Sequence, residues 1–190
     1  MKPSKTHHNI FVVTGGVQSG KSTFLSRVTE GLRKEQITVS GFLSEGKFSG
    51  ERRSSFTLVS VQNGETLSLA TIEKKEGWIR FGRFWFNPEA LDEGERIISQ
   101  GLEQGTEVVI LDEVGPFELE GGGWSRVVSL LEKEYKVVQI WVVRERILED
   151  VLKRWSIPAG QVTGIGAGNE EKIIKSIISY VRNDEISQAE

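Results

Sequence analysis

Short apolar runs alternate with amphipathic stretches along most of this 190-residue chain. Runs of β-branched and other apolar residues predict strands at residues 10–13, 37–42, 107–111 and 137–143, with a short final strand at 161–165. Apolar residues at helical spacing predict helices after residue 23, at residues 124–134 and at 145–155, with a last helix capped by Asn169. Strands that alternate with helices are typical of an α/β fold with a parallel sheet.

The middle of the chain has a different pattern. Residues 55–61 and 66–72 are rich in β-forming residues and are joined by a turn that contains Asn63-Gly64, a strong hairpin signal. Residues 81–86, with the aromatic spelling FGRFWF, predict one further short strand. We therefore expect an antiparallel hairpin insertion at about residues 43–86, within a single domain that spans residues 1–190.

The helix after this insertion has a well-marked start. Asn87 is a good N-cap residue, and Pro88 suits the first helical position because its missing N–H has no partner there in any helix. The helix is expected to run to about Leu102, with Gly101 and Gly105 near its end.

A phosphate-binding motif follows the first predicted strand. Gly15, Gly20, Lys21 and Ser22 complete the pattern G-x-x-x-x-G-K-S, in which glycines let backbone N–H groups turn inward around an anion. Lys21 supplies charge for the β- and γ-phosphates, Ser22 supplies a hydroxyl for Mg²⁺, and the helix dipole favours the same anion. The predicted nucleotide-binding residues are Gly15, Gly16, Val17, Gln18, Ser19, Gly20, Lys21, Ser22 and Thr23. A dinucleotide fingerprint would require glycine at position 17, which is valine.

A second pair of candidate residues ends the strand at 107–111. Asp112 and Glu113 follow that buried run, and the carboxyl ends of parallel strands meet at one edge of a sheet. We expect Asp112 to reach Mg²⁺ through water and Glu113 to orient and polarise an attacking water molecule.

Composition narrows the classes of function. The formal net charge is -3, so the chain has no overall positive charge for nucleic acid, and nucleic-acid binding is not expected. No apolar run approaches the ~20 residues that span a bilayer, so no membrane association is expected. The chain has no cysteine and no secretory signal pattern, which fits a cytoplasmic protein.

With these motifs the sequence resembles the small P-loop nucleoside-triphosphatases of archaea, bacteria and animals, which include the cancer-related nucleoside-triphosphatase. Residues 111–119, spelled LDEVGPFEL, are similar to the family signature D-E-[IV]-G-x-[MF]-E-L. Residues 41–45 and 53–56 resemble G-F-x-T-E and R-x-G-F, with Ser44 in place of threonine and Ser55 in place of glycine. Two places depart from the family pattern: Val17-Gln18 replaces the usual Pro-Gly, and Val143-Arg144 replaces a frequent His-Arg.

The resemblance implies a RecA-like P-loop core, a three-layer sandwich whose sheet is mostly parallel. It also implies Mg²⁺-dependent hydrolysis of ATP, GTP and other NTPs to NDP and phosphate, with broad base preference. For catalysis we add Arg53 and Arg144 as candidates for contact with the γ-phosphate, because a guanidinium can bind two phosphate oxygens. The predicted catalytic residues are then Lys21, Glu113, Arg53 and Arg144, and the predicted metal ligands are Ser22 and Asp112.

Two other functions remain open from the sequence. A nucleoside or cofactor kinase would use the same loop with an acceptor pocket and a basic lid, for which Arg52, Arg53, Arg80 and Arg83 are candidates. A nucleotide-dependent binding module would hold NTP with negligible turnover. A switch GTPase is disfavoured, because none of the asparagines is followed by the lysine of N-K-x-D. Base preference, oligomeric state and any protein partner are not identified by the sequence.

Overall fold

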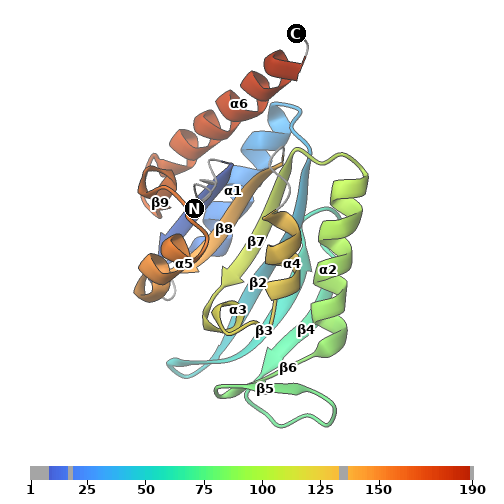
Figure 1. Cartoon of the computed structure of the whole chain (residues 1–190). Helices are drawn as coiled ribbons and strands as arrows, with labels where there is room; N and C mark the ends of the chain where they lie inside the picture. The colour runs from blue at the N-terminus through green and yellow to red at the C-terminus, as the bar shows by residue number, and fades with distance from the viewer. Residues whose placement is uncertain (1–8, 17–18, 133–136, 189–190) are drawn as a thin grey trace, which may run out of the picture.

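The computed structural model describes residues 9–16, 19–132 and 137–188. Its strands form one nine-stranded sheet, with helices on both faces (Figure 1). The first half contains β1 (Ile10–Gly15), α1 (Lys21–Lys34), β2 (Val39–Ser49), β3 (Arg52–Ser60), β4 (Thr66–Thr71), β5 (Ile79–Phe81), β6 (Phe84–Phe86) and α2 (Pro88–Glu103). The second half contains β7 (Val108–Val114), α3 (Pro116–Leu119), α4 (Ser125–Leu131), β8 (Val138–Arg144), η1 (Glu145–Ile147), α5 (Leu148–Arg154), η2 (Ala159–Gln161), β9 (Val162–Gly164) and α6 (Asn169–Gln188).

The sheet order is β5-β6-β4-β3-β2-β7-β8-β1-β9. From β2 to β9 all neighbours are parallel, and from β5 to β2 all neighbours are antiparallel. The expectation of a mostly parallel sheet is therefore wrong, because the described sheet is mixed in equal halves. The reason is the length of β2: its first residues pair with β7, and its later residues continue past β7 to pair with β3.

The hairpin region thus extends the main sheet. The turn at Asn63-Gly64 joins β3 to β4 as predicted. The single strand expected at residues 81–86 is instead a hairpin of β5 and β6, because Gly82 (φ 56°) and Arg83 form a two-residue turn between Phe81 and Phe84. Figure 1 shows this hairpin at the end of the molecule away from α6.

Side-chain alternation in the central strands divides the core into two apolar layers. In β7, Val109 and Leu111 face the layer covered by α2, α4 and α5, while Val108 and Ile110 face the layer covered by α1 and α6. The N-cap prediction for α2 is confirmed, since the Asn87 carboxamide oxygen accepts the Glu89 N–H at 3.1 Å. Asn169, expected as a cap, is the first residue of α6. In the part of the chain that the structure describes, no helix is long and apolar enough to cross a membrane.

Candidate nucleotide-binding and catalytic site

The glycine-rich loop lies between β1 and α1. Gly20 has φ 84°, a left-handed conformation that glycine adopts without strain, and α1 begins at the next residue, Lys21. A Cβ on Gly15 would come within 2.8 Å of the Ser19 Oγ, so the loop is closely packed where it leaves the strand. The Ser19 hydroxyl donates to the Gly16 carbonyl oxygen at 2.9 Å. Val17 and Gln18, two of the predicted binding residues, lie outside the described residues.

The Lys21 side chain reaches back over this loop. Its Nζ donates to the carbonyl oxygens of Gly15 at 3.1 Å and Gly16 at 2.5 Å. Burial lowers the pKa of Lys21, because the charged ammonium loses water, while Glu113 and Asp112 oppose that change. The ammonium therefore sits at the loop, on the side that faces the acidic residues of β7.

Asp112 and Glu113 lie at a β-bulge in β7. Leu111 pairs with Trp141 and Val114 pairs with Val143, so β7 advances one residue more than β8 between these pairs. Glu113 takes the left-handed conformation, with φ 63°, which is strained for a residue with a side chain. Bulges commonly redirect a side chain next to a functional site.

Asp112 is almost completely buried, with 3% of its surface exposed. Its two carboxylate oxygens accept the backbone N–H groups of Ser44 and Glu113, each at 2.8 Å. Burial and the neighbouring Glu113 raise the pKa of Asp112 to about 7, because the charged form is separated from water beside a second negative charge. The Ser44 hydroxyl is also buried, and it has no hydrogen-bond partner among the described residues.

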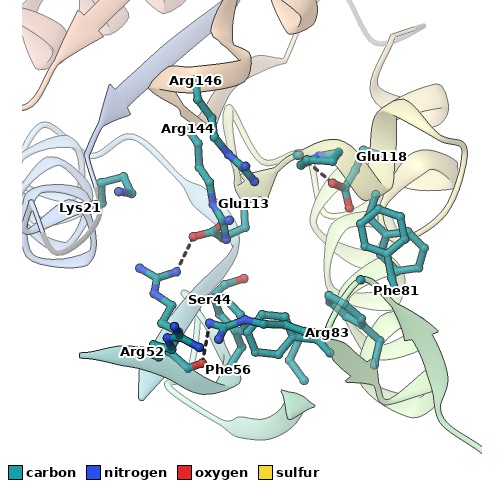
Figure 2. A pocket seen from close by; sticks show the side chains of 18 of the residues that line it. Lys21, Ser44, Arg52, Phe56, Phe81, Arg83, Glu113, Glu118, Arg144 and Arg146 are labelled. Atoms are coloured by element: carbon teal, nitrogen blue, oxygen red, sulfur yellow. Dashed lines mark hydrogen bonds and ion pairs between the residues drawn. The ribbon is translucent and has the colours of Figure 1, made fainter. Parts of the chain in front are cut away.

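Glu113 is held by two arginines from other parts of the chain. One carboxylate oxygen pairs with the Arg53 Nη1 at 2.9 Å, and the other accepts from the Arg144 Nε at 2.8 Å and Nη2 at 2.7 Å. Arg53 comes from β3 and Arg144 from the end of β8, so three strands supply this cluster. Figure 2 shows Glu113, Arg144 and Lys21 around one cavity.

That cavity has a volume of about 760 Å³. The predicted site residues that line it are Gly15, Gly16, Lys21, Arg53, Glu113 and Arg144. The predicted site residues that do not line it are Ser19, Gly20, Ser22, Thr23 and Asp112. Ser22 and Thr23 are in the first turn of α1, and Asp112 is buried within β7. The structure thus brings the four predicted catalytic residues together, although they span residues 21 to 144 of the sequence.

Sequence reasoning missed the part played by Glu118. This buried carboxylate accepts the N–H of Gly115 at 2.7 Å and the N–H of Trp124 at 3.0 Å. Burial raises the pKa of Glu118 to about 7, an effect that these two hydrogen bonds oppose. Glu118 therefore links Gly115 to Trp124 and fixes the two ends of the segment of residues 115–124. The signal was present, because a glutamate three residues after an N-cap position is part of a capping box.

Comparison with known proteins places this arrangement in a family. Residues 10–178 match the sequence profile of the NTPase family, which is most of the chain. The chain belongs to this NTPase family. A relative from Methanopyrus kandleri named nucleoside-triphosphatase THEP1 is 33% identical over 141 residues, covering 73% of this chain and 74% of the relative. A protein of the same name from Pyrococcus abyssi is 26% identical, covering 90% of this chain and 92% of the relative.

Two solved structures share the fold. The human cancer-related nucleoside triphosphatase superposes with a TM-score of 0.63 at 18% identity, covering 94% of this chain and 98% of that protein. THEP1 from Aquifex aeolicus also gives a TM-score of 0.63, at 19% identity, covering 90% of this chain and 98% of that one. The resemblance inferred from residues 111–119 and the phosphate loop is therefore confirmed at the level of the family.

Proposed function

We propose that this protein hydrolyses nucleoside triphosphates such as ATP and GTP to the diphosphate and phosphate, with Mg²⁺. The observation that carries the proposal is the position of Glu113: the bulge in β7 directs its carboxylate to the cavity that Lys21 also lines. Family membership supports the same activity, since the relatives named above are nucleoside-triphosphatases.

The phosphates would bind at the loop of residues 15–23. Its backbone N–H groups and the positive end of α1 favour an anion, and Lys21 would leave the Gly15 and Gly16 carbonyl oxygens to contact the β- and γ-phosphates. The strand order supports a RecA-like P-loop core, because β8 separates β1, which carries the loop, from β7, which carries the acidic pair. We infer a single domain over residues 1–190, because the strands of the described residues all join one sheet.

The residues available for Mg²⁺ fit its known preferences. Among the residues described, no group of three or more His, Cys, Asp or Glu side chains is placed to hold a metal ion. Mg²⁺ at such sites takes one or two protein oxygens and completes its shell with water and substrate phosphates. Ser22 and Asp112 would supply the protein's share, Asp112 through water. When bound, the ion would neutralise charge on the β- and γ-phosphates.

Glu113 would act on the attacking water. Its ion pairs with Arg53 and Arg144 hold the carboxylate in place before substrate arrives. Both guanidinium groups can donate to phosphate oxygens as well as to a carboxylate, so a γ-phosphate entering the cavity would compete for them. Glu113 would then be free to accept a hydrogen bond and a proton from water.

Turnover without any acceptor tests this function. Phosphate release is measured with a panel of NTPs and Mg²⁺ for the wild type and for Glu113→Gln. Loss of a general base typically lowers the rate by ~10²–10⁴-fold, so kcat should fall at least ~10²-fold while nucleotide affinity persists. Asp112→Asn should in addition reduce the dependence on Mg²⁺. Glu145→Gln is the matched control, because Glu145 lines the same cavity but has no proposed role.

Three outcomes separate the alternatives. Wild-type turnover in Glu113→Gln would show that this carboxylate does not activate water. Binding of NTP with negligible turnover in the wild type would favour a binding module. Consumption of NTP only when an acceptor alcohol is added would favour a kinase. We also infer a cytoplasmic location and no nucleic-acid partner, from the cysteine-free composition and the net charge of -3.

A further inference from the structure

The cavity continues past Glu113, away from the phosphate loop, into a region with aromatic walls. We name this region the aromatic chamber and define it by six lining residues: Phe48, Phe56, Phe81, Phe84, Phe86 and Phe117. They come from β2, β3, β5, β6 and α3, so the antiparallel half of the sheet forms most of the wall. None of these residues belongs to the proposed hydrolytic site.

Ring contacts hold these walls in place. Phe81 stacks on Phe117, with ring centroids 4.3 Å apart and an interplanar angle of 18°. Phe86 contacts the same Phe117 ring at 5.0 Å, and Phe56 packs edge-on against Phe84 at 5.2 Å. The aromatic surfaces are thus arranged before any ligand binds, which lowers the entropy cost of stacking a planar ring against them.

Three arginines at the cavity are not engaged by a carboxylate. Arg52, Arg83 and Arg146 line it, and none of them forms an ion pair with any described residue. Arg83 is nevertheless positioned, because its Nη2 donates to the Arg53 carbonyl oxygen at 2.7 Å and its guanidinium lies 4.8 Å from the centre of the Phe84 ring. Figure 2 shows Arg83 and Arg52 near Phe56.

The charge of the lining favours an anion. Six basic and four acidic side chains line the cavity, although the whole chain has a net charge of -3. Two of the acids are already engaged, Glu113 by two arginines and Glu118 by two backbone N–H groups. Two buried polar atoms of lining residues, the Ser44 Oγ and the Arg53 Nε, have no hydrogen-bond partner among the described residues.

The nucleoside of the NTP is not the natural occupant of the chamber. In the sheet, β1 with the phosphate loop lies on one side of β7, and β3, β6 and β5 with the chamber lie on the other. Glu113, on β7, is assigned to the γ-phosphate end of the triphosphate. The nucleoside is attached at the opposite end, so it extends away from Glu113 and from the chamber.

We propose that the aromatic chamber binds a second small molecule, a planar aromatic ring that carries one phosphate group, as a nucleoside monophosphate does. The ring stacks on the phenylalanine walls, and the phosphate binds Arg83 with Arg52 or Arg146. The whole cavity, at about 760 Å³, is within the range of small-molecule sites. That this ligand lies beside the γ-phosphate rests on the proposed function, but its binding does not.

The test is titration calorimetry on the full chain with the nucleotide site already filled. The protein is saturated with Mg²⁺ and the non-hydrolysable β,γ-imido analogue of ATP, and AMP, GMP, CMP and UMP are added in turn. At least one should bind with a stoichiometry of one. Adenosine, which lacks the phosphate, and ribose 5-phosphate, which lacks the ring, should each bind at least about tenfold more weakly, since each loses one class of contact.

Variants locate the site. Arg83→Gln and Phe81→Ala should each weaken binding of the monophosphate by about tenfold or more, and Arg83→Lys should restore part of the loss. Arg80→Gln is the matched control: Arg80 lies in the same hairpin, over the Trp85 ring, and does not line the cavity. Arg80→Gln should leave binding of the monophosphate unchanged.

Several results would overturn the inference. One is the absence of binding by all four monophosphates; another is binding that disappears when the ATP analogue is present, because the monophosphate would then have occupied the phosphate loop. A changed KM or base preference for NTP in Phe81→Ala, without second-site binding, would assign the chamber to the nucleoside of the substrate. If monophosphate binding persists while NTP is not hydrolysed, the proposed function fails and this inference stands.

Discussion

Replacing Glu118 with glutamine changes how stability depends on pH. The carboxylate is buried, and its pKa is raised from 4.5 to about 7, mainly by loss of water around the charge. The folded protein therefore binds this proton more tightly than the unfolded chain does. The stabilisation is complete below pH 4.5 and is lost as the pH rises through 7.

The size of the effect follows from the two pKa values. Full loss of the proton from the folded state costs about 3 kcal/mol, and between pH 5 and pH 8 the free energy of unfolding should fall by about 2.5 kcal/mol through this group alone. Glutamine does not titrate, so this contribution disappears. Both oxygens of the carboxyl group can accept a hydrogen bond, even when one of them carries the proton, whereas the amide has one acceptor oxygen. One of the N–H groups of Gly115 and Trp124 therefore loses its partner in the variant, at a cost of about 1–3 kcal/mol.

The variant should thus be less stable than the wild type at pH 5 and close to it at pH 8. Urea denaturation at pH 5, 6, 7 and 8, followed by tryptophan fluorescence, measures both proteins. Asp112 also has a raised pKa and adds to the wild-type dependence in the same direction, so the difference between the two proteins isolates Glu118. Glu120→Gln, an exposed position two residues away, is the control and should keep the wild-type dependence.

An unchanged pH dependence in Glu118→Gln would refute the reasoning, because the carboxylate would then titrate alike in the folded and unfolded chains. A variant that is far less stable at every pH would show that the two hydrogen bonds, rather than the buried charge, dominate at this position.

Other predictions address the sheet, a helix cap and the phosphate loop. Gly41→Ala should lower the free energy of unfolding by at least about 3 kcal/mol in thermal denaturation, because φ is 122° and the new Cβ would lie 2.1 Å from the Ile110 carbonyl oxygen. Gly64→Ala, with positive φ but open space, should cost only about 1 kcal/mol, and equal losses at both glycines would contradict the clash. Asn87→Ala should cost about 1–2 kcal/mol through loss of the α2 cap, and a wild-type melting temperature would rule this out. Lys21→Ala should lower NTP turnover ~10²–10³-fold in the phosphate-release assay, and near-normal rates would remove Lys21 from the phosphate site.

The sequence by itself determined the features that are formed by residues close together in the chain. The phosphate loop depends on glycines at fixed spacing and on Lys21 at a helix start, and these are properties of neighbouring residues. The same holds for the Asn87 cap and for the Asn63-Gly64 turn. The motif of residues 111–119 also identified the family, because its residues are consecutive in the sequence.

Contacts between distant segments were decided by the tertiary structure. Arg53 and Arg144 stand 60 and 31 residues from Glu113 in the sequence. The pairing of β3 with β2 and of β2 with β7 brings Arg53 to the Glu113 carboxylate, and the pairing of β7 with β8 brings Arg144 there. The sheet has a parallel half and an antiparallel half because β2 is long enough to pair with β7 on one side and with β3 on the other. The length of β2 depends on these two partner strands, which lie elsewhere in the sequence. The aromatic chamber is also a product of the tertiary structure. Its six phenylalanines are scattered from residue 48 to residue 117, and contacts between their rings, rather than a regular spacing in the sequence, make them one surface.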